Sequence, residues 1–191
     1  MKTLEEYVQS ASKNGQPPRP GIILGIRMSL LGLKRLEIGD PGEHKRRLVV
    51  IVETDRCLPD AIQLVTRCRL ANRTLKLRDM GKMAATFIDL PNSRAIRVAA
   101  RESANERSAI EFPGVDRLEA LAGAYRNFSD EDLCHAEWVK VGLQPEDLPG
   151  SHFPRVICEQ CGEGIGFHRE VRADGRTLCR ACAGERYYEP S

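Results

Sequence analysis

The sequence has no apolar run long enough to cross a membrane, although 41% of its 191 residues are hydrophobic. A membrane-spanning helix needs roughly 20 consecutive apolar residues. The N-terminal stretch MKTLEEYVQS contains two glutamates and lacks the apolar core of a secretory signal peptide. The net charge of +2 is too small to indicate binding to nucleic acid or to a membrane surface. We therefore expect a cytoplasmic protein that does not associate with membranes.

Cysteine is the residue type that the sequence uses most distinctively. In a chain with no export signal, seven cysteines indicate metal ligands or free thiols and not disulfides. Four of them form two Cys-x-x-Cys pairs that are separated by 17 residues: Cys158 with Cys161, and Cys179 with Cys182. This spacing is typical of a four-cysteine zinc site, because a two-residue gap lets both thiolates of a pair face one ion. The residues between the pairs predict a hairpin around Ala173-Asp174-Gly175, and a short helix is expected over 183–188. This is the element order of a treble-clef zinc finger.

We interpret the zinc as structural, with one ion per chain. Four thiolates leave no coordination position for water, and a tail this short has too small a core to fold without metal. An iron–sulfur cluster on the same cysteines stays an alternative. From Ser151 to the C-terminus, six arginines are balanced by six acidic residues. This balance does not favour nucleic acid as a partner, because phosphate binding needs a clustered excess of positive charge.

The larger part of the chain predicts an α+β fold: a mixed or antiparallel sheet of about four strands packed by helices. The apolar run 48–52 fits a buried central strand, Pro59 and Asp60 fit the start of a short helix, and Gly25 and Gly32 share one face of an apolar helix. Those glycines indicate either close packing within the chain or a dimer seam. The linker 141–155 separates a core domain, residues 1–150, from the tail, residues 151–191. The expected strands are 48–52, 74–78, 83–88 and 96–99. The expected helices are 3–13, 21–36, 59–68, 116–125 and one from 129 through 138. Residues 101–115 are expected to form a loop.

A basic run, residues 44–47, precedes the first expected strand. Short basic runs are usually solvated, so we interpret it as the entry to that strand, and an anion site is the alternative.

Several short motifs of the core occur in a characteristic order. They are Glu53-Thr54-Asp55-Arg56-Cys57, Asp60-Ala61-Ile62-Gln63, Thr66-Arg67-Cys68 and Asp79-Met80-Gly81-Lys82, preceded by Pro20-Gly21-Ile22-Ile23-Leu24-Gly25-Ile26-Arg27-Met28. Together they resemble the FmdE-like family, which is named after the FmdE component of formylmethanofuran dehydrogenase. The resemblance implies association with a molybdenum or tungsten enzyme of one-carbon metabolism, and it favours a homodimer.

The chain differs from that family at a position where imidazole side chains could bind a metal. Where the family commonly carries His-Gly-His, this sequence has Asn14-Gly15-Gln16. Cys57 and Cys68 persist and form a candidate second metal or thiol site, but free cysteines are also common as small buried apolar residues. Cys134 and His135 do not make a catalytic pair, because adjacent helical residues point in different directions.

Three functional hypotheses follow. The first, which we favour, is a non-catalytic, metal-binding accessory protein or subunit in which the zinc tail is a contact surface. The second is a metal-dependent regulator or adaptor that binds protein or nucleic acid through the zinc finger. The third is a redox or hydrolytic enzyme that uses Cys57 and Cys68, and the missing imidazoles weigh against it.

Overall fold

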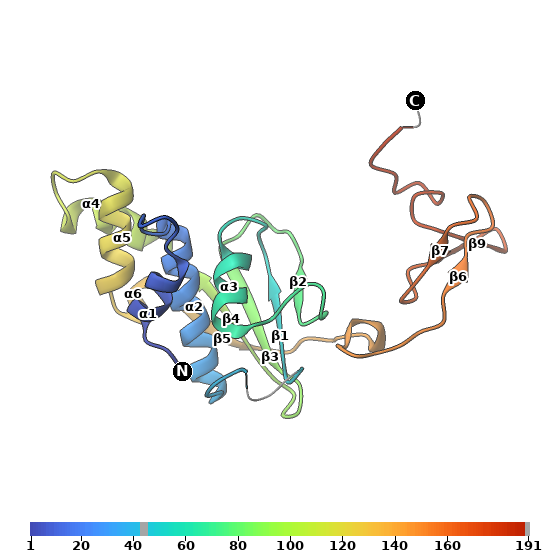
Figure 1. Ribbon diagram of the computed structural model, residues 1–191, viewed down its shortest axis with the longest axis horizontal. Coiled ribbons are helices and arrows are strands. Elements are labelled where there is room, and N and C mark those ends of the chain that lie inside the picture. The colour runs from blue at the N-terminus through green and yellow to red at the C-terminus, as the bar shows by residue number, and fades with distance from the viewer. Residues whose placement is uncertain (43–45, 190–191) are drawn as a thin grey trace. The chain divides into compact units, whose positions relative to one another are not determined.

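The computed structural model describes the chain except for residues 43–45 and 190–191. It divides into two compact units, Met1–Gly142 and Leu143–Ser191, which we describe separately (Figure 1). Part of the basic run 44–47 lies outside the described residues. No helix in the described part of the chain has the length and apolar character needed to span a membrane.

The first unit is built on a mixed sheet of five strands in the order β2-β1-β3-β4-β5. Among the described strands of this sheet, only β1 and β2 run parallel, and the neighbouring pairs β1–β3, β3–β4 and β4–β5 are antiparallel. The parallel pair is joined through helix α3, as a parallel connection requires. This confirms the predicted α+β class. Of the two expected kinds of sheet, mixed or antiparallel, the sheet is mixed, and it has five strands where about four were expected. The strands are β1 (Leu48–Val52), β2 (Leu75–Leu77), β3 (Ala84–Asp89), β4 (Arg94–Ala100) and β5 (Cys134–Val139).

Within the described residues, six helices accompany the sheet, and α2 is the most buried of them. Its partners include α1, α3, α5 and strands β3 and β4. The N-terminus of α1 carries a capping box in which Thr3 accepts from the backbone amide of Glu6 and the Glu6 carboxylate accepts in return. The helices are α1 (Leu4–Ala11), α2 (Pro20–Leu36), α3 (Leu58–Thr66), α4 (Glu102–Glu111), α5 (Arg117–Asn127) and α6 (Asp130–Leu133).

Two glycines let α2 approach its neighbours closely. A Cβ atom at Gly32 would lie 2.5 Å from the ring of Phe87 on β3, and one at Gly25 would lie 2.6 Å from the Cβ of Ala61 on α3. Both positions are buried, and Phe87 is fully enclosed. Of the two interpretations of these glycines, close packing within the chain is therefore confirmed at both positions.

Arg27 of α2 fixes the end of α5. Its guanidinium donates to the carbonyl oxygens of Tyr125, Arg126 and Phe128 at 2.9–3.2 Å, and it pairs with Asp130 at 2.7 Å. These carbonyls are among the groups that a helix leaves unpaired at its C-terminus. The arginine thus satisfies them and joins α2 to the turn that leads into α6 and β5.

A second buried ion pair joins the residue before β1 to the end of β3. Arg47 donates two hydrogen bonds, at 2.7 and 2.8 Å, to the fully buried carboxylate of Asp89. The guanidinium holds the pKa of Asp89 below its usual value of 3.8. The described end of the basic run 44–47 thus leads into β1, as expected, but the side chain of Arg47 is paired with a buried carboxylate and is not simply solvated.

Two sequence predictions for the core were wrong. Residues 134–139 form strand β5, and not the continuation of a helix from residue 129, because Ala136 and Trp138 pair with Val98 and Ile96 of β4. Residues 101–115 were expected to form a loop, but most of them form α4. This helix buries only the small residues Ala104 and Ser108, so it lacks the apolar stripe from which an amphipathic helix is recognised.

The second unit contains short elements only. They are a 3₁₀ turn η1 (Pro145–Asp147) and the strands β6 (Val156–Ile157), β7 (Gly164–Ile165), β8 (Val171–Ala173) and β9 (Arg176–Leu178), which pair as β6–β7 and β8–β9. The expected hairpin around residue 174 is present. The short helix expected over 183–188 is not, since this segment forms turns, and the treble-clef order is incomplete to that extent.

The packing of α2 leads to a stability prediction. Gly32→Ala places a methyl group against the enclosed ring of Phe87, and such overpacking costs about 1–3 kcal/mol. We expect a lower free energy of unfolding in urea, although alanine is the better helix former. Gly39→Ala is the matched control, because a Cβ there meets nothing within 4 Å. Equal stability of the two variants would contradict the packing argument.

Candidate metal centre

The first cysteine pair lies in the turn between β6 and β7. The backbone amide of Cys158 donates to the carbonyl of Glu163, and that of Gly162 donates to the carbonyl of Cys158. Gly162 has φ = +76°, a backbone conformation that glycine adopts without steric cost. This turn brings Cys161 back beside Cys158.

The β8–β9 hairpin brings the second pair to the first. Asp174 and Gly175 at its tip both have positive φ, as a two-residue type I′ turn requires. The amide of Glu159 donates to the carbonyl of Thr177, and the amide of Thr177 donates to the carboxylate of Glu159. These two bonds fix β9, and hence Cys179 directly after it, against the first turn.

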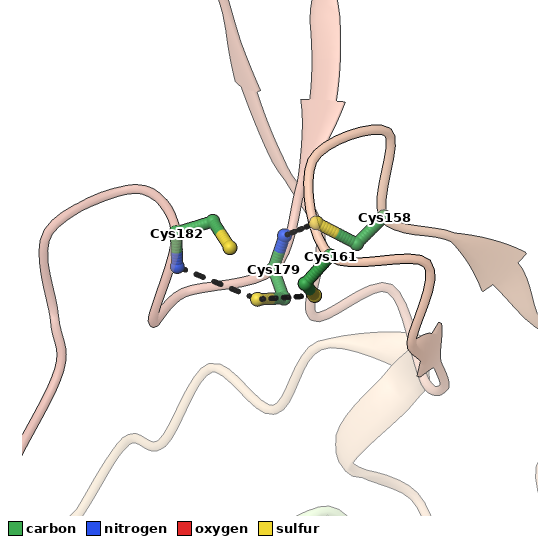
Figure 2. Close-up of side chains that lie close together, drawn as sticks. All are labelled: Cys158, Cys161, Cys179 and Cys182. Carbon is green, nitrogen blue, oxygen red and sulfur yellow. Dashed lines mark hydrogen bonds between the residues drawn. The ribbon is translucent and has the colours of Figure 1, made fainter. Parts of the chain in front are cut away.

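All four sulfur atoms of the tail converge on one point. The Sγ atoms of Cys158, Cys161, Cys179 and Cys182 all lie within 4.8 Å of one another, and those of Cys161 and Cys179 are 3.9 Å apart (Figure 2). Tetrahedral zinc with Zn–S bonds of about 2.3 Å places its sulfurs roughly 3.8 Å apart. The geometry therefore fits one zinc ion on these four residues.

The charges that four neighbouring thiolates would carry favour binding of a cation at the cluster. The backbone amides of Cys161 and Cys179 lower the pKa of Cys158 to about 6, and the amide of Cys179 lies 3.2 Å from the Cys158 sulfur. Contact with the thiol of Cys179, together with burial, raises the pKa of Cys182 to about 12. One thiolate thus forms readily, whereas four thiolates together need a positive ion to offset their repulsion. Metal binding must release protons from this site.

The four-thiolate set determines what a bound zinc ion can do. Four protein ligands complete the tetrahedral shell of zinc and leave no place for a reactive water. The buried apolar cluster around the site comprises only Cys158, Ile165 and Leu178. So small a core provides little stabilisation, so the ion would contribute folding energy to the tail.

The core cysteines occupy opposite ends of α3. Cys57 precedes the helix, and its sulfur would lie 3.1 Å from a Cβ at Gly21 of α2. Cys68 follows the helix, is 3% exposed, and its thiol lies 3.6 Å from the carbonyl of Leu48, while burial raises its pKa. The nine residues of α3 span roughly 14 Å, so the two thiols are not brought together for one ion.

Cys57 instead lines a cleft of about 700 Å³ together with Gln16. Gln16 stands in the segment where the resembling family carries imidazoles, and an amide oxygen is a poor partner for a thiophilic metal. Among the described residues, only the four tail cysteines gather three or more metal-ligating side chains around one point. The residues of the core therefore do not fit a second metal ion.

The sequence alone did not reveal that this cleft is charged. Its walls come from the α1–α2 connection, the start of α2 and the start of α3. The lining residues are Ser10, Ala11, Lys13, Gln16, Pro17, Pro18, Arg19, Ile22, Asp55, Arg56, Cys57, Asp60 and Leu64. They lie in two segments more than thirty positions apart, and no local pattern connects them. The available signal was the run Asp55-Arg56-Cys57 after a buried strand, a usual place for ligand sites.

Cys134 and His135 do not form a reactive pair. Cys134 is buried, and burial, followed by the charge of Asp130, raises the pKa of its thiol to about 12. His135 is exposed on the other face of β5, because successive strand residues point to opposite sides of a sheet. The prediction that these neighbours do not act together agrees with their positions, although they lie on a strand and not on a helix.

These features define a class of protein: an α+β core that carries a separate four-cysteine metal-binding tail. Residues 19–134 match the family model described as "FmdE, Molybdenum formylmethanofuran dehydrogenase operon". Because this match covers more than half of the sequence, the chain belongs to the FmdE family. Residues 153–188 match the prokaryotic dksA/traR C4-type zinc finger. Both parts of the predicted resemblance, the FmdE-like core and the four-cysteine zinc finger, are confirmed.

Two individual proteins are similar to the chain over most of its length. The crystal structure of a tungsten formylmethanofuran dehydrogenase FmdE-like protein from Syntrophus aciditrophicus aligns with a TM-score of 0.63 and 27% identity, covering 98% of this chain and 96% of that one. A probable S-adenosyl-L-methionine-binding protein of Archaeoglobus fulgidus is 27% identical over 190 residues, which cover 88% of this chain. The chain spans about half the length of that second protein.

The cluster geometry leads to a prediction about metal binding. Cys161→Ser removes one of the four ligands. Mutation of a residue that only hydrogen-bonds to a ligand typically lowers metal affinity about 10–100-fold, so we expect the loss of a ligand itself to lower zinc affinity by more. Amide hydrogen exchange should become fast in residues 151–189 and stay slow in the sheet. Cys57→Ser, which lies outside the cluster, should keep its zinc. Unchanged zinc affinity in Cys161→Ser would contradict the four-cysteine site.

Proposed function

We propose that this protein is a non-catalytic accessory protein of formylmethanofuran dehydrogenase type, in which structural zinc maintains the tail as a contact surface. The observation that carries the proposal is the closed set of four cysteine sulfurs on a unit of its own. Four thiolates hold an ion without offering it to a substrate. In the core, Cys57 and Cys68 stand at the two ends of α3 and make no shared reactive site.

The surface of the tail supports a role in contacts with a larger partner. Tyr187 is 96% exposed and lies 5.2 Å, between ring centroids, from Tyr188, and Ile157 beside the first cysteine pair is 61% exposed. Tyrosine and other large apolar side chains are enriched in the centres of protein interfaces. The names of the family and of the Syntrophus aciditrophicus protein refer to a molybdenum or tungsten enzyme, and we infer an enzyme of this kind as the partner.

The first experiment measures metal per chain by elemental analysis. We expect one zinc per chain in the natural protein and in the double variant Cys57→Ser plus Cys68→Ser, because neither residue belongs to the tail cluster. A second metal that disappears in the double variant would overturn the non-catalytic interpretation of the core. Cys161→Ser serves as the matched control that should lose zinc.

The partner is tested by affinity purification from the native organism. The proposal predicts molybdenum or tungsten in the eluate, in an amount that falls in the variant Ile157→Asp plus Tyr187→Ser while the zinc content stays at one. If the eluate of the natural protein contained neither molybdenum nor tungsten, the accessory role would be contradicted. Salt-dependent binding to duplex DNA would instead favour the regulator hypothesis.

The charged cleft of the core favours a second function, the binding of a small ligand. Its charged lining side chains form no ion pair within the described part of the chain, whereas Arg27, Arg47 and Arg97 elsewhere in the core are paired with carboxylates. A volume of about 700 Å³ lies within the usual range for ligand sites. The unpaired cleft residues are Lys13, Arg19, Asp55, Arg56 and Asp60.

S-adenosyl-L-methionine is the ligand that we propose for this cleft. The molecule carries a carboxylate, an ammonium group and a sulfonium cation, which complement the basic and acidic groups of the lining. Ile22 and Leu64 add apolar walls to the cleft. The description of the Archaeoglobus fulgidus relative motivates this choice, which comes to the present chain as a proposal.

Calorimetry with S-adenosyl-L-methionine tests the assignment. Arg56→Ala and Asp60→Asn should each weaken binding about tenfold, equivalent to about 1.4 kcal/mol, since each removes one charge contact. Arg117→Ala, an exposed arginine outside the cleft, is the matched control. S-adenosylhomocysteine, which lacks the sulfonium charge, should bind more weakly. No binding at millimolar ligand, or equal binding by Arg56→Ala, would exclude this function.

A further inference from the structure

A second hollow of the core has a volume of about 690 Å³ and differs in character from the charged cleft. It lies between the segment 17–20, which leads into α2, and the α4–α5 connection together with one face of α5 (Figure 1). Three prolines of that segment form one wall, and Phe112, Val115, Leu118 and Ala122 form the other. We call this hollow the apolar groove, because apolar side chains make up most of its lining.

The walls of the apolar groove are held in place by the fold itself. Proline fixes its own φ angle and restricts the residue before it, so the segment 17–20 has little conformational freedom. Gly123 lets the ring of Phe112 lie against α5, since a Cβ atom at this position would lie 3.0 Å from the ring. Leu118 stands in the first turn of α5, which Asp116 caps by accepting from the Leu118 amide. The groove therefore exists before a ligand binds.

Two apolar side chains of the groove are left facing water. Leu118 is 60% exposed and Val115 is 46% exposed, whereas Phe112 and Ala122 pack in part against the core. A contiguous apolar surface with a polar rim is typical of a binding site. The volume of the groove lies within the range of roughly 300–1,000 Å³ that small-molecule sites occupy. These features point to a small ligand with an apolar body.

The charged residues of the groove indicate the sign of the ligand. Two guanidinium groups, those of Arg19 and Arg126, line it against the single carboxylate of Glu119. Arg126 pairs with Glu5 at 3.4 Å, but that carboxylate is 67% exposed, and pairs so exposed contribute little. Within the described residues, no ion pair or side-chain hydrogen bond involves Arg19. A ligand with one negative charge would balance the excess of one positive charge.

We propose that the apolar groove binds a small organic carboxylate with an apolar body, such as a medium-chain fatty acid. The apolar body lies on Val115 and Leu118 and removes them from water, and the carboxylate pairs with Arg19. A guanidinium suits this role, because it donates two parallel hydrogen bonds to a carboxylate. Burial of the chain supplies most of the affinity, since burying one methylene group contributes about 0.8 kcal/mol.

The apolar groove and the charged cleft are separate sites that share one wall. Pro17, Pro18 and Arg19 line both hollows. The charged cleft adds acidic and basic groups from the start of α3, whereas the apolar groove adds the exposed apolar face of α5. A ligand with charges of both signs suits the first site, and a ligand with one charged end suits the second. The fatty-acid site therefore does not depend on the function proposed for the cleft.

Titration calorimetry of the zinc-loaded full chain with decanoate tests the site. Decanoate should bind saturably, and decylamine, which has the same chain and a positive charge, should bind at least tenfold more weakly. Leu118→Asp places a carboxylate on the apolar wall and should weaken decanoate binding at least tenfold. Ile110→Asp is the matched control, because Ile110 is 76% exposed and lies outside the groove. Amide NMR signals of residues 115–123 should shift on binding, which locates the ligand.

A neutral analogue separates the role of the charge from that of the apolar wall. Arg19→Gln should lower decanoate affinity to that of decanol and leave decanol binding unchanged, whereas Arg117→Gln, outside the groove, should keep the preference for decanoate.

The two proposed sites can fail separately. Leu118→Asp should still bind S-adenosyl-L-methionine if the charged cleft does, and Asp60→Asn should still bind decanoate. No saturable binding at millimolar decanoate, or equal binding by Leu118→Asp, would overturn the proposal. Equal affinity for decanoate and decylamine would overturn the assignment of a carboxylate.

Discussion

The close approach of α2 to its neighbours is the constraint on which the core depends. Gly32 allows the helix to lie directly on the ring of Phe87, and Gly25 allows contact with Ala61 of α3. Once α2 is placed, Arg27 reaches the C-terminal carbonyls of α5 and thereby positions the segment that leads into β5. The charged cleft also depends on where this one helix lies, because the start of α2 forms one of its walls.

The tail depends on a different interaction, the attraction of four sulfur ligands to one cation. Its apolar cluster is too small to hold the turns together. The backbone hydrogen bonds around Cys158 and Glu159 position the cysteine side chains. The core is held by apolar burial, whereas the four cysteines of the tail are placed to hold it together by coordination of one ion. From this difference we expect that loss of metal affects the tail and leaves the core unchanged.

The four tail cysteines are clustered, whereas the two core cysteines are separated, and the proposed function depends on this difference. The tail cysteines come together because two tight turns and one hairpin place them so. The core cysteines, Cys57 and Cys68, are kept apart by the rigid length of α3. The chain belongs to the FmdE family, but among the described residues the cleft that Cys57 and Gln16 line has no cluster of metal-ligating side chains.

The sequence by itself determined the features that arise from local spacing. The two Cys-x-x-Cys pairs, the helix that begins near Thr3, the buried run of β1 and the hairpin at Asp174-Gly175 all involve residues close in the chain, where turn geometry and periodicity suffice. Local pattern failed at α4, whose apolar stripe is missing, and at β5, which is a strand because β4 provides its partner. The separation of Cys57 from Cys68, the cleft shared by Arg19 and Arg56, and the place of β5 at the edge of the sheet were decided by tertiary structure alone. They depend on contacts between distant segments, and such contacts leave no period or spacing in the sequence.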